Sequence, residues 1–344
     1  MPFLRTAIIL VAIAAAMMPF PAAWIERVYS RVLYPSWQPY VTFVSNLSPI
    51  ALLDVGIALL LVRSGVALRR DWRVRGSRRA FVAAAGRLTT TAAVIYLLFL
   101  STWGLNYRRV PLEARLEFDR ARIGQAAATQ LATLAIERVN AGYVRAHSQA
   151  FRPDALERAL AETQLLLGST HQALVGRPKL SVAGFYFRYA AVDGMTVPVF
   201  LEIILNPDIL PIEMPSVLAH EWAHLAGYAD ESEASFVSWI AGVRSDDPVA
   251  QYSAWLDAYA LAVNALPRSA RASLPALAPG PLQDLRDIAA RYARSSPRVR
   301  AAARGVYDSY LKANRIEEGI ANYGVALQLI LGTGFDEDWK PRLR

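Results

Sequence analysis

Apolar residues are concentrated in the first third of the chain, in three segments that cover about residues 6–23, 41–62 and 88–105. Each segment has about the 20 residues that a helix needs to cross the hydrocarbon core of a bilayer. Aromatic residues, which favour the membrane interfaces, stand near the segment ends: Trp24, Trp37, Tyr40, Trp103 and Tyr107. The pattern therefore predicts a membrane domain of residues 1–105 with three transmembrane helices.

Two details of these segments allow more than one interpretation. The first segment is either a cleaved signal peptide or an uncleaved anchor, and Pro21-Ala22-Ala23 fits a cleavage site poorly, which favours the anchor. The second segment contains Asp54, and a carboxylate within a membrane is a candidate functional residue. Asp54 also follows soon after Pro49, in a position close to the outer interface, where a carboxylate needs no such function.

The rest of the chain, residues 106–344, has the mixed polarity of a folded domain. Residues 111–140 and 153–168 are typical of helices, and strand-forming residues follow over 179–205, with a hairpin turn at Asp193-Gly194. From Pro215 onward the pattern is again mostly helical. We therefore expect an α+β fold that is mainly helical, with a small antiparallel sheet. The strand near 197–205 is the natural edge for an extended peptide to join.

Charge divides the chain at the same place. The net charge is +8, but residues 106–344 hold 26 basic and 26 acidic residues, so the whole excess belongs to residues 1–105. This removes the main reason to expect a nucleic-acid partner. The chain has no cysteine, which excludes disulfides, thiolate metal sites and a cysteine nucleophile.

The basic excess predicts an orientation in the membrane. The loop of residues 63–87 contains eight arginines against one acid, Asp71, and short basic loops stay in the cytoplasm. The N-terminus is then cytoplasmic, residues 24–40 form an outer loop, and everything after Leu105 is extracytoplasmic. The sequence thus predicts a multi-pass protein of the inner (cytoplasmic) membrane that contacts membrane lipid.

The chemistry is concentrated at His220-Glu221-Trp222-Ala223-His224. Residues four apart share one face of a helix, so the two imidazoles can bind one Zn²⁺. Glu221 cannot be a ligand from the same turn, but it is placed to act as general base toward a metal-activated water. The alternative is a helix with two surface histidines. The apolar flanking residues count against it, and Gly227 allows the chain to turn back with a third ligand.

Asp230, Glu231 and Glu233 are the candidates for that third ligand. If a helix begins near Asp230, one of its faces carries mostly small residues after the first acid: Glu231, Ala234, Ser235, Ser238 and Gly242. This face nominates Glu231, with Glu233 in reserve, and Ser235 is placed to hydrogen-bond a ligand histidine. A His-His-Glu set leaves a fourth position open, as in catalytic rather than structural zinc sites. Tyr228 and Tyr323 are the candidates for stabilising an oxyanion.

These motifs resemble those of two families of proteins. Glu-Ser-Glu-Ala-Ser at 231–235 resembles the third-ligand helix of gluzincin metallopeptidases, although Ser235 stands where several of those families have an acid or an amide. The whole layout resembles the bacterial domain-of-unknown-function family 3810, through Trp-Gly-Leu-Asn-Tyr at 103–107, the His-Glu-x-x-His motif and Glu-x-Glu-Ala-x-Phe at 231–236. The resemblance implies a zincin-like fold and a peptidase activity, without a known substrate.

Together these features predict a membrane-anchored zinc metalloprotease that hydrolyses peptide or protein substrates in the cell envelope. One alternative is a zinc hydrolase that acts on a non-peptide envelope substrate. Another is a membrane scaffold or sensor whose metal site is vestigial. The presence of Glu221 favours an enzyme, because a vestigial site does not need the base.

Overall fold

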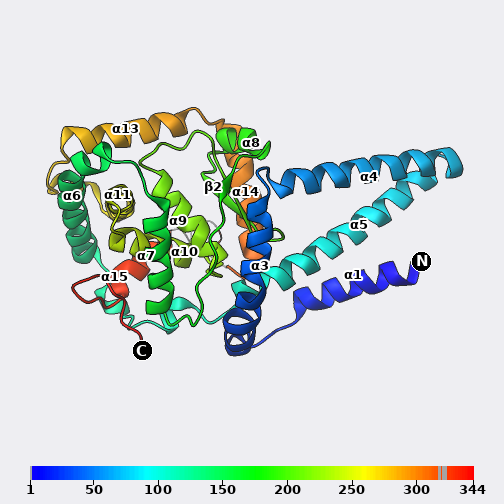
Figure 1. Cartoon of the computed structure of the whole chain (residues 1–344), viewed down its shortest axis with the longest axis horizontal. Coiled ribbons are helices and arrows are strands. Elements are labelled where there is room, and N and C mark those ends of the chain that lie inside the picture. Colours follow the sequence, from blue (N-terminus) through cyan, green and yellow to red (C-terminus); the bar gives the residue numbers. More distant parts are fainter. Residues whose placement is uncertain (1, 317–318, 320–323) are drawn as a thin grey trace.

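The structure is a computed structural model that describes residues 2–316, 319 and 324–344. Figure 1 shows two parts: a mainly helical domain, and three helices that project from one side of it. The projecting helices are α1 (Pro2–Met17), α4 (Leu52–Arg75) and α5 (Ser77–Thr102). The N-terminal end of α1 and the turn between α4 and α5 both lie at the far end, away from the domain (Figure 1).

The projecting helices correct the prediction of three transmembrane helices. Among the described residues, α5 is the one single helix that is long and apolar enough to cross a membrane. The pair Phe3–Met17 and Ala22–Leu47, bent by 104°, is a second candidate, so one or two spans are supported and three are not confirmed. The predicted segment 41–62 is not one helix. Ser48 precedes Pro49 and adopts an extended backbone, so one helix ends at Leu47 and the next begins at Leu52.

The prediction of an arginine-rich loop over residues 63–87 is also wrong in its conformation. Helix α4 continues to Arg75 and α5 begins at Ser77, so the connection is reduced to Gly76, whose φ is +74°. Arginine is a good helix former, and its charge is no obstacle on an exposed helix surface. The segment therefore forms the far end of a helical hairpin.

Residues 22–47, which include the expected outer loop 24–40 and the start of the predicted span 41–62, are helical and pack on the domain. They form α2 (Ala22–Trp24), the π-helix η1 (Ile25–Leu33) and α3 (Tyr34–Leu47). Ile25 and Tyr34 are fully buried or nearly so in the same core as Trp222. The Tyr34 hydroxyl donates to the Leu225 carbonyl at 2.7 Å. The packed domain thus includes residues that precede the predicted boundary at residue 105.

The remaining helices confirm the expectation of a mainly helical fold. Three short 3₁₀ turns follow α5: η2 (Gly104–Arg108), η3 (Leu112–Ala114) and η4 (Arg120–Arg122). The α-helices after them are α6 (Gln125–Ser148), α7 (Pro153–Leu166), α8 (Ala183–Ala190), α9 (Met214–Leu225), α10 (Glu231–Arg244), α11 (Pro248–Ala265), α12 (Arg268–Ala272), α13 (Pro279–Ala293), α14 (Pro297–Ala313) and α15 (Val325–Gly332). Helix α10 lies at the centre, where it packs against α7, α9, α11 and α15.

The sheet of the described residues has three strands in the order β1-β3-β2. They are β1 (Pro178–Lys179), β2 (Gly194–Val197) and β3 (Glu202–Leu205). Strands β2 and β3 are antiparallel, whereas β1 and β3 are parallel, so the sheet is mixed and not purely antiparallel as expected. Because β3 is the central strand, the edges of the sheet belong to β1 and β2, and the predicted strand near 197–205 is not an edge strand over Glu202–Leu205.

Two further expectations for this region were wrong. Residues 183–190 form α8 instead of a strand, because Gly184, Phe187 and Ala190 are buried at the spacing of three that one face of a helix provides. The aromatic residues between them gave the segment its strand-like composition. The hairpin turn lies between β2 and β3, where Leu201 has a φ of +46°, and Asp193-Gly194 instead leads into β2.

Candidate metal centre

The two histidines of the motif lie on one face of α9, as their spacing predicts. Their Nε2 atoms are 3.1 Å apart. After α9 the chain turns at Gly227, whose φ of +88° is readily adopted only by glycine. Helix α10 then begins at Glu231, capped by Asp230, whose side chain accepts from the backbone N–H groups of Ser232 and Glu233. Asp230 is therefore occupied as a helix cap.

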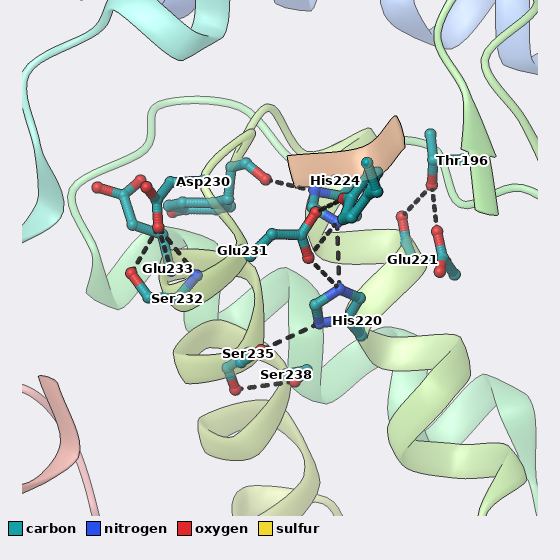
Figure 2. Close-up of polar contacts among 12 residues, drawn as sticks. Thr196, His220, Glu221, His224, Asp230, Glu231, Ser232, Glu233, Ser235 and Ser238 are labelled. Carbon is teal, nitrogen blue, oxygen red and sulfur yellow. Dashed lines mark hydrogen bonds and ion pairs between the residues drawn. The ribbon is translucent and has the colours of Figure 1, made fainter. Parts of the chain in front are cut away.

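Of the two remaining acids, the structure brings Glu231 to the histidines. Its Oε2 lies 3.2 Å from Nε2 of His220 and 3.6 Å from Nε2 of His224. Glu233 points away from them, and its carboxylate accepts from the backbone N–H of Leu112 at 2.5 Å. Burial, together with nearby Asp230, raises the pKa of Glu233 to about 7. Figure 2 shows the two carboxylates on opposite sides of the start of α10.

The three converging atoms fit a zinc ion in spacing and chemistry. They all lie within 4.8 Å of one another. Ligand atoms of a tetrahedral zinc ion, each about 2.0–2.1 Å from the metal, stand about 3.3 Å apart. The measured separations of 3.1 to 3.6 Å are close to this value. Two imidazole nitrogens and one carboxylate oxygen are also a donor set that zinc prefers.

Hydrogen bonds on the far side of each ring orient the histidines. Nδ1 of His224 lies 2.8 Å from the Tyr228 carbonyl, which can only accept, so Nδ1 carries the proton and Nε2 of the neutral ring presents a lone pair. Ser235 lies one turn into α10, and its hydroxyl is 3.3 Å from Nδ1 of His220, the contact expected of it. Both rings are thus held with Nε2 toward Glu231.

The electrostatics of the cluster favour positive charge. Burial favours the neutral form of Glu231, but the two histidines outweigh it and hold the pKa of Glu231 well below its usual range. Burial likewise opposes protonation of His224, yet the carboxylate of Glu231 raises the pKa of His224 to about 9. A buried carboxylate that favours a cation between two imidazoles suits a divalent metal.

Glu221 lies on the other side of the histidine pair from Glu231, and it is outside the donor set (Figure 2). Its carboxylate is held by β2, because the Thr196 hydroxyl lies 2.8 Å from Oε2. The close approach requires glycine on the same strand: a Cβ atom at Gly194 would stand 2.7 Å from Oε1 of Glu221. Burial raises the pKa of Glu221, and the two histidines and Thr196 reduce that rise.

A tyrosine that sequence reasoning missed contacts the cluster from α14. The hydroxyl of Tyr307 donates to Oε1 of Glu231. Tyr310 stacks on Tyr307 with ring centroids 5.8 Å apart, and its hydroxyl lies 3.4 Å from that of Tyr107. The one signal in the sequence was the spacing of three between Tyr307 and Tyr310, which puts both side chains on one face of a helix. This spacing does not indicate that the face contacts Glu231.

The two predicted oxyanion candidates have different outcomes. Tyr323 lies outside the described residues. Tyr228 takes part in the site through its backbone carbonyl, which bonds His224. Its ring instead packs beneath the guanidinium of Arg109, 5.3 Å from the ring centroid.

Comparison with known proteins places the chain in a family. A family model described as "Protein of unknown function (DUF3810)" matches residues 29–331. The chain belongs to the DUF3810 family. No curated protein and no solved structure matches it. The DUF3810 match includes α9, α10 and α14, so the whole cluster of His220, His224, Glu231 and Tyr307 lies within the family's region.

The Trp-Gly-Leu-Asn-Tyr segment of this DUF3810 chain joins the projecting helices to the cluster. Trp103 directly follows α5, and its indole N–H donates to the His224 carbonyl at 2.8 Å. Asn106 accepts from the hydroxyl of Ser30 on η1 at 2.8 Å. Tyr107 reaches the tyrosines of α14, as described above. The segment thus ties the end of α5 to the helix that carries both histidines.

Asp54, the candidate carboxylate of the second apolar segment, has a structural role. It lies in the first turn of α4, where its two oxygens accept from the Ser181 hydroxyl at 2.6 Å and the Val182 backbone N–H at 2.9 Å. These residues directly precede α8. Asp54 therefore fastens α8 to the start of α4, and it lies apart from the histidine cluster.

Proposed function

We propose that this protein is a zinc-dependent metallopeptidase anchored in the inner membrane. The observation that carries the proposal is the convergence of His220 Nε2, His224 Nε2 and Glu231 Oε2. Zinc bound there would polarise the scissile carbonyl and activate water for attack. The ligand set uses three side chains, which leaves room for water or substrate, as in catalytic zinc sites.

Glu221 is the general base in this proposal. It is adjacent to a ligand histidine in sequence, it is outside the donor set, and Thr196 holds its carboxylate in one position. A carboxylate so held takes a proton from the attacking water and returns it to the leaving amine. Tyr307 is our candidate for the donor that stabilises the oxyanion, because its hydroxyl already lies against Glu231. Tyr323 stays a prediction.

The edge of the sheet supports a peptide substrate over a non-peptide one. Strand β2 is an edge strand, and its residues Gly194 and Thr196 contact Glu221. An extended peptide that pairs with this edge brings its backbone carbonyls beside the base. A substrate without a polypeptide backbone does not use this edge, and a scaffold with a vestigial metal site does not need Glu221.

The exchange of Glu221 for glutamine tests the proposal. The variant Glu221→Gln should keep about one zinc per chain, because Glu221 is not a ligand, and it should lose proteolysis by roughly 10²- to 10⁴-fold, the usual contribution of a general base. Metal content and cleavage of a peptide library measure the two effects. Glu137→Gln is the matched control, because Glu137 is exposed on α6. Equal complementation of a deletion strain by wild type and Glu221→Gln would contradict an enzymatic function.

The proposed orientation puts the domain outside the cytoplasm. The supporting observation is that the start of α1 and the arginine-rich turn at Gly76 lie at one end of the projecting helices and the domain at the other (Figure 1). Alkaline phosphatase fused after Leu105 should be active, and the same enzyme fused near Gly76 should be inactive. Loss of α1 by cleavage leaves this result unchanged. The reverse pattern would overturn the orientation and the substrate compartment.

A further inference from the structure

Helix α3 turns its polar face toward the domain. The side chains of Gln38, Thr42 and Ser45 are buried there. The amide of Gln38 donates to the Leu174 carbonyl at 2.8 Å, and the Thr42 hydroxyl donates to the Leu201 carbonyl at 3.2 Å. These hydrogen bonds attach α3 to the domain along most of its length, so α3 is not a helix that crosses a membrane independently.

The opposite face of α3 is apolar and exposed. Its large side chains recur at the helical spacing of three and four: Tyr40, Phe43, Val44 and Leu47. Tyr40 is 73 % exposed and Leu47 is 68 % exposed. No residue of α3 is charged. An amphipathic helix of a soluble domain has the reverse arrangement, with its apolar face inside, so this face indicates an apolar surrounding.

Helix α8 presents a second exposed apolar surface at the same boundary of the domain. Val182, which directly precedes α8, is 82 % exposed, and Phe185 and Tyr186 on α8 are also exposed. Asp54 fastens the start of α8 to the first turn of α4, so this surface lies where α4 leaves the domain (Figure 1). We call the exposed apolar side chains of α3 and α8 the boundary surface.

The direction of α3 identifies what covers the boundary surface. Residues 22–47, which end with α3, are bent by 104° from α1, and α1 packs along α5, the candidate span. A helix nearly perpendicular to a span lies in the plane of the membrane. In Figure 1, α3 runs across the ends of the projecting helices at the edge of the domain. Its apolar face and the projecting helices therefore meet the same layer of lipid.

Helix α14 adds basic residues along the same boundary. Its N-terminal end adjoins α8, where the Ser296 backbone N–H donates to the Tyr189 carbonyl at 3.0 Å. Beyond its C-terminal end, Arg315 donates to the Met18 carbonyl, next to the end of α1. Arg298 and Arg304 are exposed along the helix. Basic side chains at the level of lipid headgroups are attracted to anionic phospholipids.

We propose that the boundary surface is embedded in the interface of the bilayer, so that the domain lies on the membrane with its metal centre at the lipid surface. The indole of Trp103, the first residue after α5, donates to the carbonyl of ligand candidate His224. The cluster is therefore one hydrogen bond from the end of the candidate span. If the proposed peptidase function holds, the substrate class is a polypeptide anchored in the same membrane and cleaved just outside the bilayer.

The depth of the boundary surface can be measured without any enzymatic activity. The chain has no cysteine, so Val44→Cys and Tyr186→Cys each accept a single nitroxide label. Val144→Cys is the control, because Val144 is exposed on α6, away from the projecting helices (Figure 1). The full chain is placed in nanodiscs of phosphatidylethanolamine and phosphatidylglycerol. Labels at positions 44 and 186 should collide mainly with oxygen, which dissolves in lipid, and the label at 144 mainly with a water-soluble nickel chelate.

Two results of this measurement would overturn the proposal. Labels at 44 and 186 that collide with nickel as readily as the label at 144 mean that the surface faces water. Labels shielded from both oxygen and nickel mean that a protein covers it. The collision rates with oxygen and with nickel depend neither on bound zinc nor on Glu221.

The substrate class is tested with one peptide in two forms, free and attached to a lipid in the same nanodisc. Wild type should prefer the attached form by roughly 10²-fold, the gain expected from confinement to one surface. Phe43→Asp with Val44→Asp should reduce that preference, because it lifts the metal centre away from the lipid surface while the projecting helices keep the chain in the nanodisc. It should leave cleavage of the free peptide unchanged, and Val144→Asp should alter neither. Equal cleavage of both forms by wild type overturns the substrate class. Cleavage of neither form overturns the peptidase function and leaves the depth result standing.

Discussion

The helix pairs α9–α10 and α4–α5 are alike in local construction and differ in what surrounds them. Each pair is joined through a glycine with a positive φ, Gly227 at +88° and Gly76 at +74°. Helix α10 is buried along almost its whole length. In α4 the four consecutive residues 59–62 are all exposed, so every face of the helix is at least partly open there.

This difference shows where each pair finds its partners. In α9–α10 the side chains that matter are held by other side chains of the domain: Ser235 contacts His220, and Tyr307 contacts Glu231. In α4–α5 most of the large apolar side chains are exposed and have few protein partners. Substitutions in the first pair should therefore change the site and the stability of the domain, and substitutions at the exposed positions of the second should change neither.

The largest effect is expected for the metal ligands. His224→Ala should abolish stoichiometric zinc binding, and Glu231→Gln should weaken it strongly, because each removes one of three converging donor atoms. Metal analysis of the purified full chain measures the loss. Glu233→Gln is the matched control, since its carboxylate bonds the Leu112 backbone instead of facing the histidines. If Glu233→Gln lost more zinc than Glu231→Gln, the assignment of the third ligand would be wrong.

A large loss of stability, although a smaller effect than the loss of zinc, is expected at Glu202 on β3, where the projecting helices meet the domain. Its buried carboxylate accepts from the backbone N–H groups of Leu52 and Leu53 at the start of α4, and it pairs with buried Lys179 at 2.9 Å. Glu202→Ala should lower the free energy of unfolding by about 3–5 kcal/mol, because it leaves a buried ammonium without its partner. Denaturant unfolding of the domain in detergent measures this value.

The double variant separates the charge from the helix cap. Adding Lys179→Met to Glu202→Ala removes the unpaired charge and should recover a part of the lost stability. Full additivity of the two changes would show that the buried pair contributes nothing specific.

Local sequence rules predicted the parts of the site that lie on single helices. The sequence predicted that His220 and His224 share one face of a helix, because this depends only on helix geometry. It also predicted the turn at Gly227, because this depends on one backbone angle. The sequence also favoured Glu231 over Glu233 as the third ligand, because two residues that are two positions apart on a helix point in different directions. The structure brings together the residues that this reasoning selected.

The same local rules failed where distant contacts decide the structure. Residues 183–190 have a strand-like composition, but Asp54 and the packing of Phe187 hold them as α8. Tyr307 and Thr196 reach the site from segments far from α9 in the chain, and no local pattern reports such an approach. The apolar length of residues 41–62 similarly concealed that its first part, residues 41–47, belongs to α3 and is attached to the domain.

One matched pair of substitutions compares a buried position on α10 with an exposed position on α4. Ile240 on α10 is 0 % exposed and Leu61 on α4 is 68 % exposed. Ile240→Ala should cost about 2–5 kcal/mol of unfolding free energy, because it leaves a cavity in a packed core. Leu61→Ala should change that free energy by less than about 0.5 kcal/mol, since its exposed side chain has few protein contacts to lose. The same denaturant titration in detergent measures both. A cost for Leu61→Ala near that of Ile240→Ala would show that α4 packs against protein, and the contrast between the two helix pairs would then fail.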